Sequence, residues 1–116
     1  MITVVNKHHH QATEDDVYVG RGSALGNPYT GTKPLASTKA MFQAGSREES
    51  IELYESWIRE KIRTKDKAVC KALNEIYLRS VRGSVNLVCF CKPKACHADV
   101  IRAIVMEKLE QKFPLL

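Results

Sequence analysis

Apolar residues recur along the chain with two different periods, and each period indicates one kind of element. Two short stretches rich in Val, Ile and Tyr, ITVVN (2–6) and DVYVG (16–20), have the composition of β-strands. A longer and almost unbroken apolar run, VNLVCFC (85–91), is typical of a strand that is covered on both faces. The polar segment 8–16 between the first two strands is expected to be a loop.

Three longer segments carry the three-to-four-residue spacing of amphipathic helices. The clearest is SREESIELYESWIREKI (46–62), which opens on a Ser-x-x-Glu capping box. A second helix is expected over 66–80, with Asp66 as its N-cap, and a last helix over 97–112. A short additional helix over 36–43 is predicted because small and apolar residues fall there at helical intervals.

The order of these elements is strand, strand, one or more helices, helix, strand, helix. Strands that alternate with helices predict the α/β class, with a short, mostly parallel sheet flanked by helices in a Rossmann-like layering. The sequence contains no internal repeat and no linker-like segment. We therefore expect a single small domain over residues 1–116.

The composition excludes several classes of protein. Hydrophobic residues make up 44% and charged residues 27% of the 116 residues, as in an ordinary soluble globular protein. No stretch approaches the roughly 18 to 20 apolar residues of a membrane span, and the start of the chain lacks the layout of a signal peptide. We expect a cytoplasmic protein with reduced cysteines, in a bacterium or, if a phage encodes it, in the host cell.

The net charge of +5 is distributed unevenly. Residues 1–58 contain five Lys or Arg and seven Asp or Glu, whereas residues 59–116 contain thirteen and six. This asymmetry favours an anionic partner, either a phosphate-bearing ligand or nucleic acid. A basic and solvated helix face explains the same charge without a ligand.

The first loop that carries candidate chemistry is GRGSALGNP (20–28), which follows a predicted strand. Its glycines allow a positive φ and a close approach of the backbone to a ligand. Arg21 offers a planar fork for phosphate, and Asn27 can bond a ligand or fix its own turn. The candidate ligand-binding residues are Gly20, Arg21, Gly22, Ser23, Gly26 and Asn27, together with Lys92 from the second loop. A purely structural turn is the alternative.

The second loop, CFCKPKACH (89–97), gathers soft donors between a strand and the start of a helix. The positive end of a helix dipole attracts anions and lowers the pKa of a thiol. This favours a catalytic pair in which Cys96, or alternatively Cys89, is the thiolate and His97 the acid, base or phosphate donor. Two other interpretations stay open. Cys89, Cys91, Cys96 and His97 are a tetrahedral zinc set, or Cys89 packs in the core and only His97 is exposed.

Three motifs in a fixed order carry a resemblance to a known family. V-G-R-G-S-x-L-G-N-P-Y, Y-x-x-W and L-V-C-F-C-K-P-K-A-C-H resemble domain-of-unknown-function family 4326, which occurs in bacteriophages and bacteria. The C-x-C-x-P-x-x-C-H segment is also similar to one in family 488, where Glu and Arg stand in place of Cys91 and Ala98. The first resemblance covers Asp16 to about Leu109. It implies that both loops belong to one site, formed by Gly20, Arg21, Gly22, Ser23, Gly26, Asn27, Pro28, Cys89, Cys91, Pro93, Cys96 and His97.

If the strands before the two loops are parallel neighbours, both loops leave the sheet at the same edge. The leading hypothesis is then a domain that binds a nucleotide or another phosphate-bearing small molecule in a crevice between the loops. Transfer or hydrolysis by Cys96 and His97 would be an additional activity, since no complete catalytic motif is present. The alternative is a non-enzymatic, zinc-stapled module that binds nucleic acid or a host protein through Lys92 and Lys94.

Overall fold

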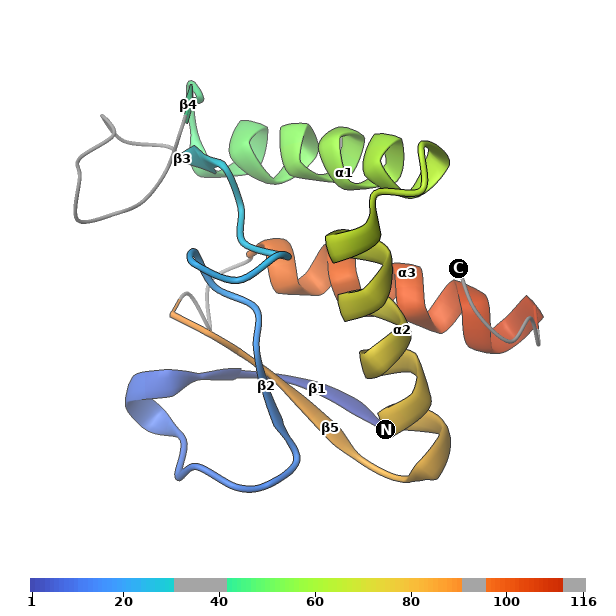
Figure 1. The fold of residues 1–116 in the computed structure, drawn as a ribbon. Helices are drawn as coiled ribbons and strands as arrows, with labels where there is room; N and C mark the ends of the chain where they lie inside the picture. The colour runs from blue at the N-terminus through green and yellow to red at the C-terminus, as the bar shows by residue number, and fades with distance from the viewer. Residues whose placement is uncertain (31–41, 91–95, 112–116) are drawn as a thin grey trace.

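A parallel three-stranded sheet forms one side of the molecule in a computed structural model that describes residues 1–30, 42–90 and 96–111 (Figure 1). The strand order is β1-β5-β2, with β1 at Ile2–Asn6, β5 at Val85–Cys89 and β2 at Asp16–Tyr18. Both outer strands pair in parallel with β5, so the last strand in the sequence lies between the first two. The predicted α/β class with a parallel sheet is confirmed.

Three α-helices follow the long periodic segments of the sequence: α1 (Arg47–Arg63), α2 (Lys67–Arg82) and α3 (His97–Gln111). The predicted N-caps are formed, since the Ser46 and Asp66 side chains each accept a backbone N–H of the first turn. Helices α2 and α3 contact the sheet, and α1 contacts both of these helices (Figure 1). Within the described residues, no helix has the length and apolar character that crossing a bilayer requires.

The short elements differ from the expectation. The segment predicted as a loop after β1 begins with a 3-10 helix, Lys7–His9, and Tyr29–Thr30 (β3) pairs in parallel with Phe42–Gln43 (β4). The predicted helix over 36–43 lies outside the described residues except for its last two, which form β4 and are not helical. Strands of two residues have no detectable period, because alternation needs several residues to become visible.

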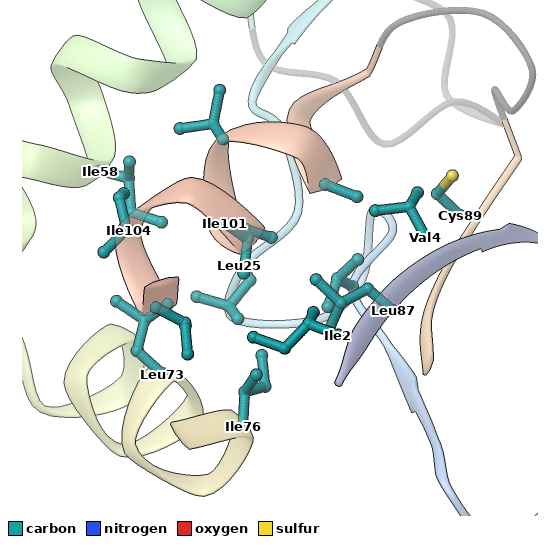
Figure 2. Packing of buried hydrophobic residues seen from close by; sticks show 14 of the residues in the cluster. Ile2, Val4, Leu25, Ile58, Leu73, Ile76, Leu87, Cys89, Ile101 and Ile104 are labelled. Carbon is teal, nitrogen blue, oxygen red and sulfur yellow. The ribbon is translucent and has the colours of Figure 1, made fainter. Parts of the chain in front are cut away.

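One cluster of buried side chains fills the space between the sheet and the helices (Figure 2). Alternate strand residues reach it, because successive side chains of a strand point to opposite faces. Leu25, from the middle of the glycine-rich loop, is buried in the same cluster, so this loop is anchored in the core. The other labelled members are Ile2, Val4, Ile58, Leu73, Ile76, Leu87, Cys89, Ile101 and Ile104.

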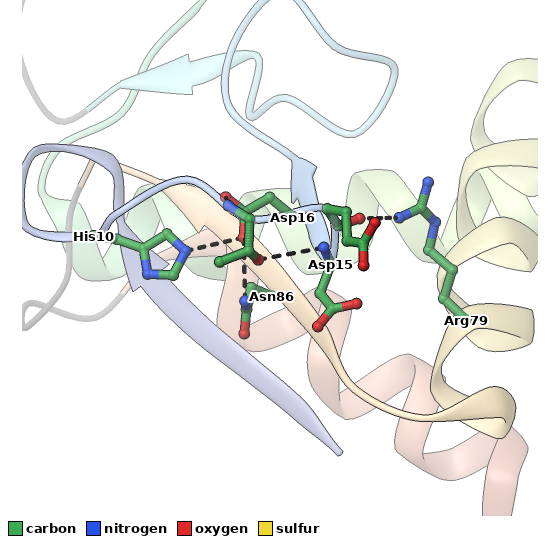
Figure 3. Close-up of polar contacts among 7 residues, drawn as sticks. His10, Asp15, Asp16, Arg79 and Asn86 are labelled. Atoms are coloured by element: carbon green, nitrogen blue, oxygen red, sulfur yellow. Dashed lines mark hydrogen bonds and ion pairs between the residues drawn. The ribbon is translucent and has the colours of Figure 1, made fainter.

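Opposite the helices, Asp16 of β2 is the centre of a polar network (Figure 3). Its carboxylate lies 2.9 Å from Nε2 of His10 and accepts hydrogen bonds from Nδ2 of Asn86 and the backbone N–H of Thr13, each at 3.1 Å. Partial burial disfavours the charged form, but the hydrogen bonds from these three residues outweigh it and lower the pKa of Asp16 to about 2. The network ties the segment between β1 and β2 to the central strand.

Asp16→Asn is expected to lower the stability at pH 7 and to remove part of the acid sensitivity. The folded pKa of Asp16 lies below its unfolded value, so its contribution is present above about pH 4 and is lost as the pH falls toward 2. Urea denaturation at pH 7, 4 and 2.5 should therefore show the two proteins converging at low pH. Asp15→Asn, at an exposed neighbour, is the matched control, and equal behaviour of both variants would contradict a role for the network.

Candidate functional site

The glycine-rich loop and the start of α3 meet at the carboxyl-terminal edge of the sheet. Nε2 of His97, the first residue of α3, donates a hydrogen bond of 2.6 Å to the carbonyl oxygen of Val19, directly before Gly20. Strands β2 and β5 are parallel neighbours, so the segments that follow them leave the sheet at one edge. Residues far apart in the sequence are thereby brought into direct contact.

His97 is buried at 7% exposure, although the packing interpretation of the sequence expected it to be exposed. Its ring packs edge-on against Tyr54, with the two centroids 5.1 Å apart. Burial lowers the pKa of His97, the hydrogen bond to Val19 opposes this, and the nearby Arg21 guanidinium lowers it further. The imidazole is therefore neutral at pH 7 with its proton on Nε2, because a carbonyl can only accept. Nδ1 is left as an acceptor.

Cys89 and Cys96 lie against each other as buried thiols. Their sulfur atoms are 3.4 Å apart, with Cys96 donating, which is well beyond the roughly 2.05 Å of a disulfide. Two thiolates on one tetrahedral zinc ion are separated by about 3.8 Å, given Zn–S bonds of about 2.3 Å. The structure thus brings together two of the four proposed zinc ligands.

Cys91 and Lys92 of the CFCKPKACH loop, both predicted as site residues, lie outside the described part of the chain. Among the residues that are described, no three His, Cys, Asp or Glu side chains are grouped so that they could hold an ion. The predicted zinc set stays a prediction.

Cys96 occupies the position before the first turn of α3. Its backbone N–H donates to Oδ2 of Asp99 at 3.1 Å, which is half of a capping box. A carboxylate at this end of a helix is stabilised by the positive end of the helix dipole. An external anion bound at the N-terminus of α3 would therefore interact with the same positive end of the helix dipole as the Asp99 carboxylate.

Arg21 holds the glycine-rich loop closed. Its Nε and Nη2 atoms donate to the carbonyl oxygens of Asn27 and Tyr29, at 3.0 and 2.7 Å. The hydroxyl of Ser23 donates to the carbonyl oxygen of Gly20 at 2.6 Å. Both side chains, predicted as ligand donors, thus bond the backbone of their own loop, and only the other N–H groups of Arg21 are left for a ligand.

The same loop is fastened to α1. Nδ2 of Asn27 donates to Oγ of Ser50 at 3.0 Å, and its Oδ1 accepts the backbone N–H of Tyr29 at 2.9 Å. The hydroxyl of Tyr54 donates to the carbonyl oxygen of Leu25 at 2.7 Å. Asn27 therefore fixes its own turn, which was one of its two predicted roles. Ser50 and Tyr54 were not predicted as site residues. Tyr54 belongs to the Y-x-x-W motif, which was the signal in the sequence that pointed to it.

Two of the glycines are required by the backbone of the loop. A Cβ on Gly26 would lie 2.8 Å from both the Cα of Arg21 and the carbonyl oxygen of Gly20. Gly22 has a φ of 100°, in the region that favours glycine. These two positions have a structural reason to be glycine, whether or not a ligand approaches them.

Comparisons with known proteins agree with the motif pattern. The model of the family described as Domain of unknown function (DUF4326) matches residues 4–107. A protein of Enterobacteria phage T4, described as an uncharacterized 12.4 kDa protein in the nrdA-td intergenic region, is 34% identical over 110 residues. The alignment covers 95% of this chain and 82% of that protein. No solved structure matches the chain.

Proposed function

The chain belongs to the DUF4326 family, and for this member we propose that it binds a phosphate-bearing small molecule, a nucleotide or nucleoside derivative, where the glycine-rich loop meets the start of α3. The observation that carries the proposal is the hydrogen bond from His97 to the carbonyl oxygen of Val19. It joins the residue that follows β2, directly before the glycine-rich turn, to the N-terminus of α3. Ligands of parallel α/β sheets bind outside the carboxyl ends of the strands.

Charge and aromatic surface at this edge support a nucleotide over a simpler anion. Arg21 is close enough to His97 to lower its pKa. Lys7 stands 5.7 and 5.8 Å from the ring centroids of Tyr18 and Phe90, which are 40% and 45% exposed. Exposed aromatic rings stack on nucleobases, and cations nearby suit a phosphate.

Any chemistry at this site would use His97 as a base. A neutral imidazole cannot hold a phosphate by charge, but its Nδ1 can accept a proton. Cys96 would be the candidate nucleophile, and because it is buried, its thiol would have to become exposed before it could react. Turnover can be tested separately from binding, because a ligand can bind at this site without proton transfer to His97 or attack by Cys96.

A thermal shift screen with ribonucleotides, deoxyribonucleotides and dinucleotides tests the binding. A ligand at 100 times its Kd stabilises the folded state by about 2.7 kcal/mol, which raises Tm by several degrees. Cys96→Ser, which keeps a good N-cap residue, should reduce this shift. Cys70→Ser on α2 is the matched control and should retain it. The proposal is wrong if no nucleotide raises Tm, or if both serine variants respond like the wild type.

A zinc-stapled module is the second candidate, and the 3.4 Å separation of the Cys89 and Cys96 sulfur atoms favours it. Cys91 would then be a third ligand, and the module would present Lys92 and Lys94 to nucleic acid or a host protein. Protein purified without added metal should contain one zinc ion per chain and should unfold on chelation. Metal-free protein whose Tm is unchanged by EDTA would remove this candidate.

A further inference from the structure

An open groove of about 1070 Å³ lies along the outer face of α2, away from both loops. It reaches Asp15, directly before β2, and Ser84, directly before β5. These residues mark the amino-terminal edge of the parallel sheet, whereas the candidate ligand site lies at the carboxyl-terminal edge. The groove is therefore a separate surface.

Positive charge dominates this groove. One of its cations, Arg79, already has partners. Its Nη2 donates to Oε1 of Glu75 at 3.1 Å, and its Nη1 donates to the carbonyl oxygen of Glu14 at 3.3 Å (Figure 3). Once this pair is set aside, Asp15 is the one carboxylate among the described lining residues. Four cations line the groove beside it: Lys65, Lys67, Lys71 and Arg82.

The cations lie at both ends of the helix. Lys65, Lys67 and Lys71 stand at the start of α2, and Arg82 is its last residue. At 1.5 Å per residue, Lys67 and Arg82 are about 22 Å apart along the helix, which equals roughly six steps of 3.4 Å along one strand of a duplex. A linear polyanion can reach both ends of the groove, whereas a single small anion can contact only one of them.

The other lining residues favour nucleic acid over an acidic protein. Leu78, 42% exposed, is the one large apolar side chain among the described residues that line the groove, and none of them is aromatic. Protein partners usually bind through a central cluster of buried aromatic or other large side chains. Phosphate contacts need only cations and polar groups such as Asn74.

We infer that the groove along α2 binds the sugar-phosphate backbone of nucleic acid, without reading its bases. The inference is independent of the proposed nucleotide site, because it uses other residues at the opposite edge of the sheet. It is also distinct from the zinc-stapled alternative, whose basic residues are Lys92 and Lys94. The nucleotide site, the zinc-stapled module and the nucleic-acid groove can therefore each be disproved without affecting the other two.

Fluorescence anisotropy with labelled 20-nucleotide DNA, its duplex and RNA of the same sequence, between 50 and 200 mM NaCl, tests the inference. Four phosphate contacts predict a slope of log K against log salt of about −3.6 for the duplex and about −2.8 for single strands. Affinity for the duplex should thus fall about 10²-fold over this range. Lys67→Gln/Lys71→Gln should reduce the duplex slope to about −1.8 and weaken binding at 50 mM.

The control removes the same charge elsewhere. Arg47→Gln/Lys108→Gln changes two cations outside the groove, on α1 and α3, and should bind nucleic acid like the wild type. Circular dichroism establishes that both double variants are folded. Three outcomes would overturn the inference: no binding at 50 mM, equal weakening by both variants, or binding of polyglutamate and heparin but of no nucleic acid.

Discussion

Tyr54→Ala is expected to lower the free energy of unfolding by about 3–5 kcal/mol, as other buried aromatic residues do when truncated. Tyr54 is fully buried, at 0% exposure. Its ring contacts the rings of Trp57 and His97, with centroid separations of 5.6 and 5.1 Å. Since small domains are stable by only about 5–15 kcal/mol, the loss should be visible as a large decrease in the urea midpoint.

Tyr54→Phe separates the ring from the hydroxyl group. Phenylalanine keeps the packing and loses only the hydrogen bond to the carbonyl oxygen of Leu25, so a cost of about 1–2 kcal/mol is expected. Burial, and to a smaller extent Cys96, raise the pKa of the Tyr54 hydroxyl, which keeps it a donor at any working pH. Equal losses in both variants would mean that the ring contributes nothing, contrary to its central place in the core.

His97→Ala is expected to cost about 2–4 kcal/mol and to flatten the dependence of stability on pH. The substitution leaves the buried carbonyl oxygen of Val19 without its donor and opens a cavity beside Tyr54. In the wild type the folded pKa of His97 is lowered, so the unfolded chain takes up a proton first as the pH falls below about 6.5. Stability therefore decreases from pH 7 toward pH 5, and the alanine variant lacks this contribution.

Urea denaturation at pH 7.5, 6.5 and 5.5 measures both effects of His97→Ala in one experiment. His9→Ala, at an exposed position in the 3-10 helix, is the control and should keep the wild-type dependence on pH. If His97→Ala loses as much stability as the wild type between pH 7.5 and 5.5, the interpretation of His97 as a buried and neutral imidazole is wrong.

The long elements could be predicted because their causes are local. The caps at Ser46 and Asp66 lie within one turn of the groups that they bond, and the apolar stripes repeat inside each helix. The pairing of β3 with β4 has no such cause, since each strand has two residues. The central position of β5 depends on contacts with the first residues of the chain, and the sequence near β5 gives no sign of the order in the sheet.

The proximity of the two loops could be predicted from the expectation of parallel neighbouring strands, but the roles of the individual loop residues could not. Arg21 and Ser23 have the chemistry of ligand donors, yet a tight turn contains carbonyl groups that must be bonded, and these side chains bond them. The burial of His97 depends on Tyr54 of α1, and no local pattern joins these two residues. Cys91 and Lys92 lie outside the described residues, so their roles stay predictions.

The position of β5 has a consequence for synthesis on the ribosome. Strands β1 and β2 emerge early, but each pairs with β5, which is translated after α1 and α2. Until then the nascent chain exposes two unpaired strand edges, which are sites for aggregation. Closure of the sheet must wait for the last third of the chain, and pairings between residues so distant in sequence form slowly.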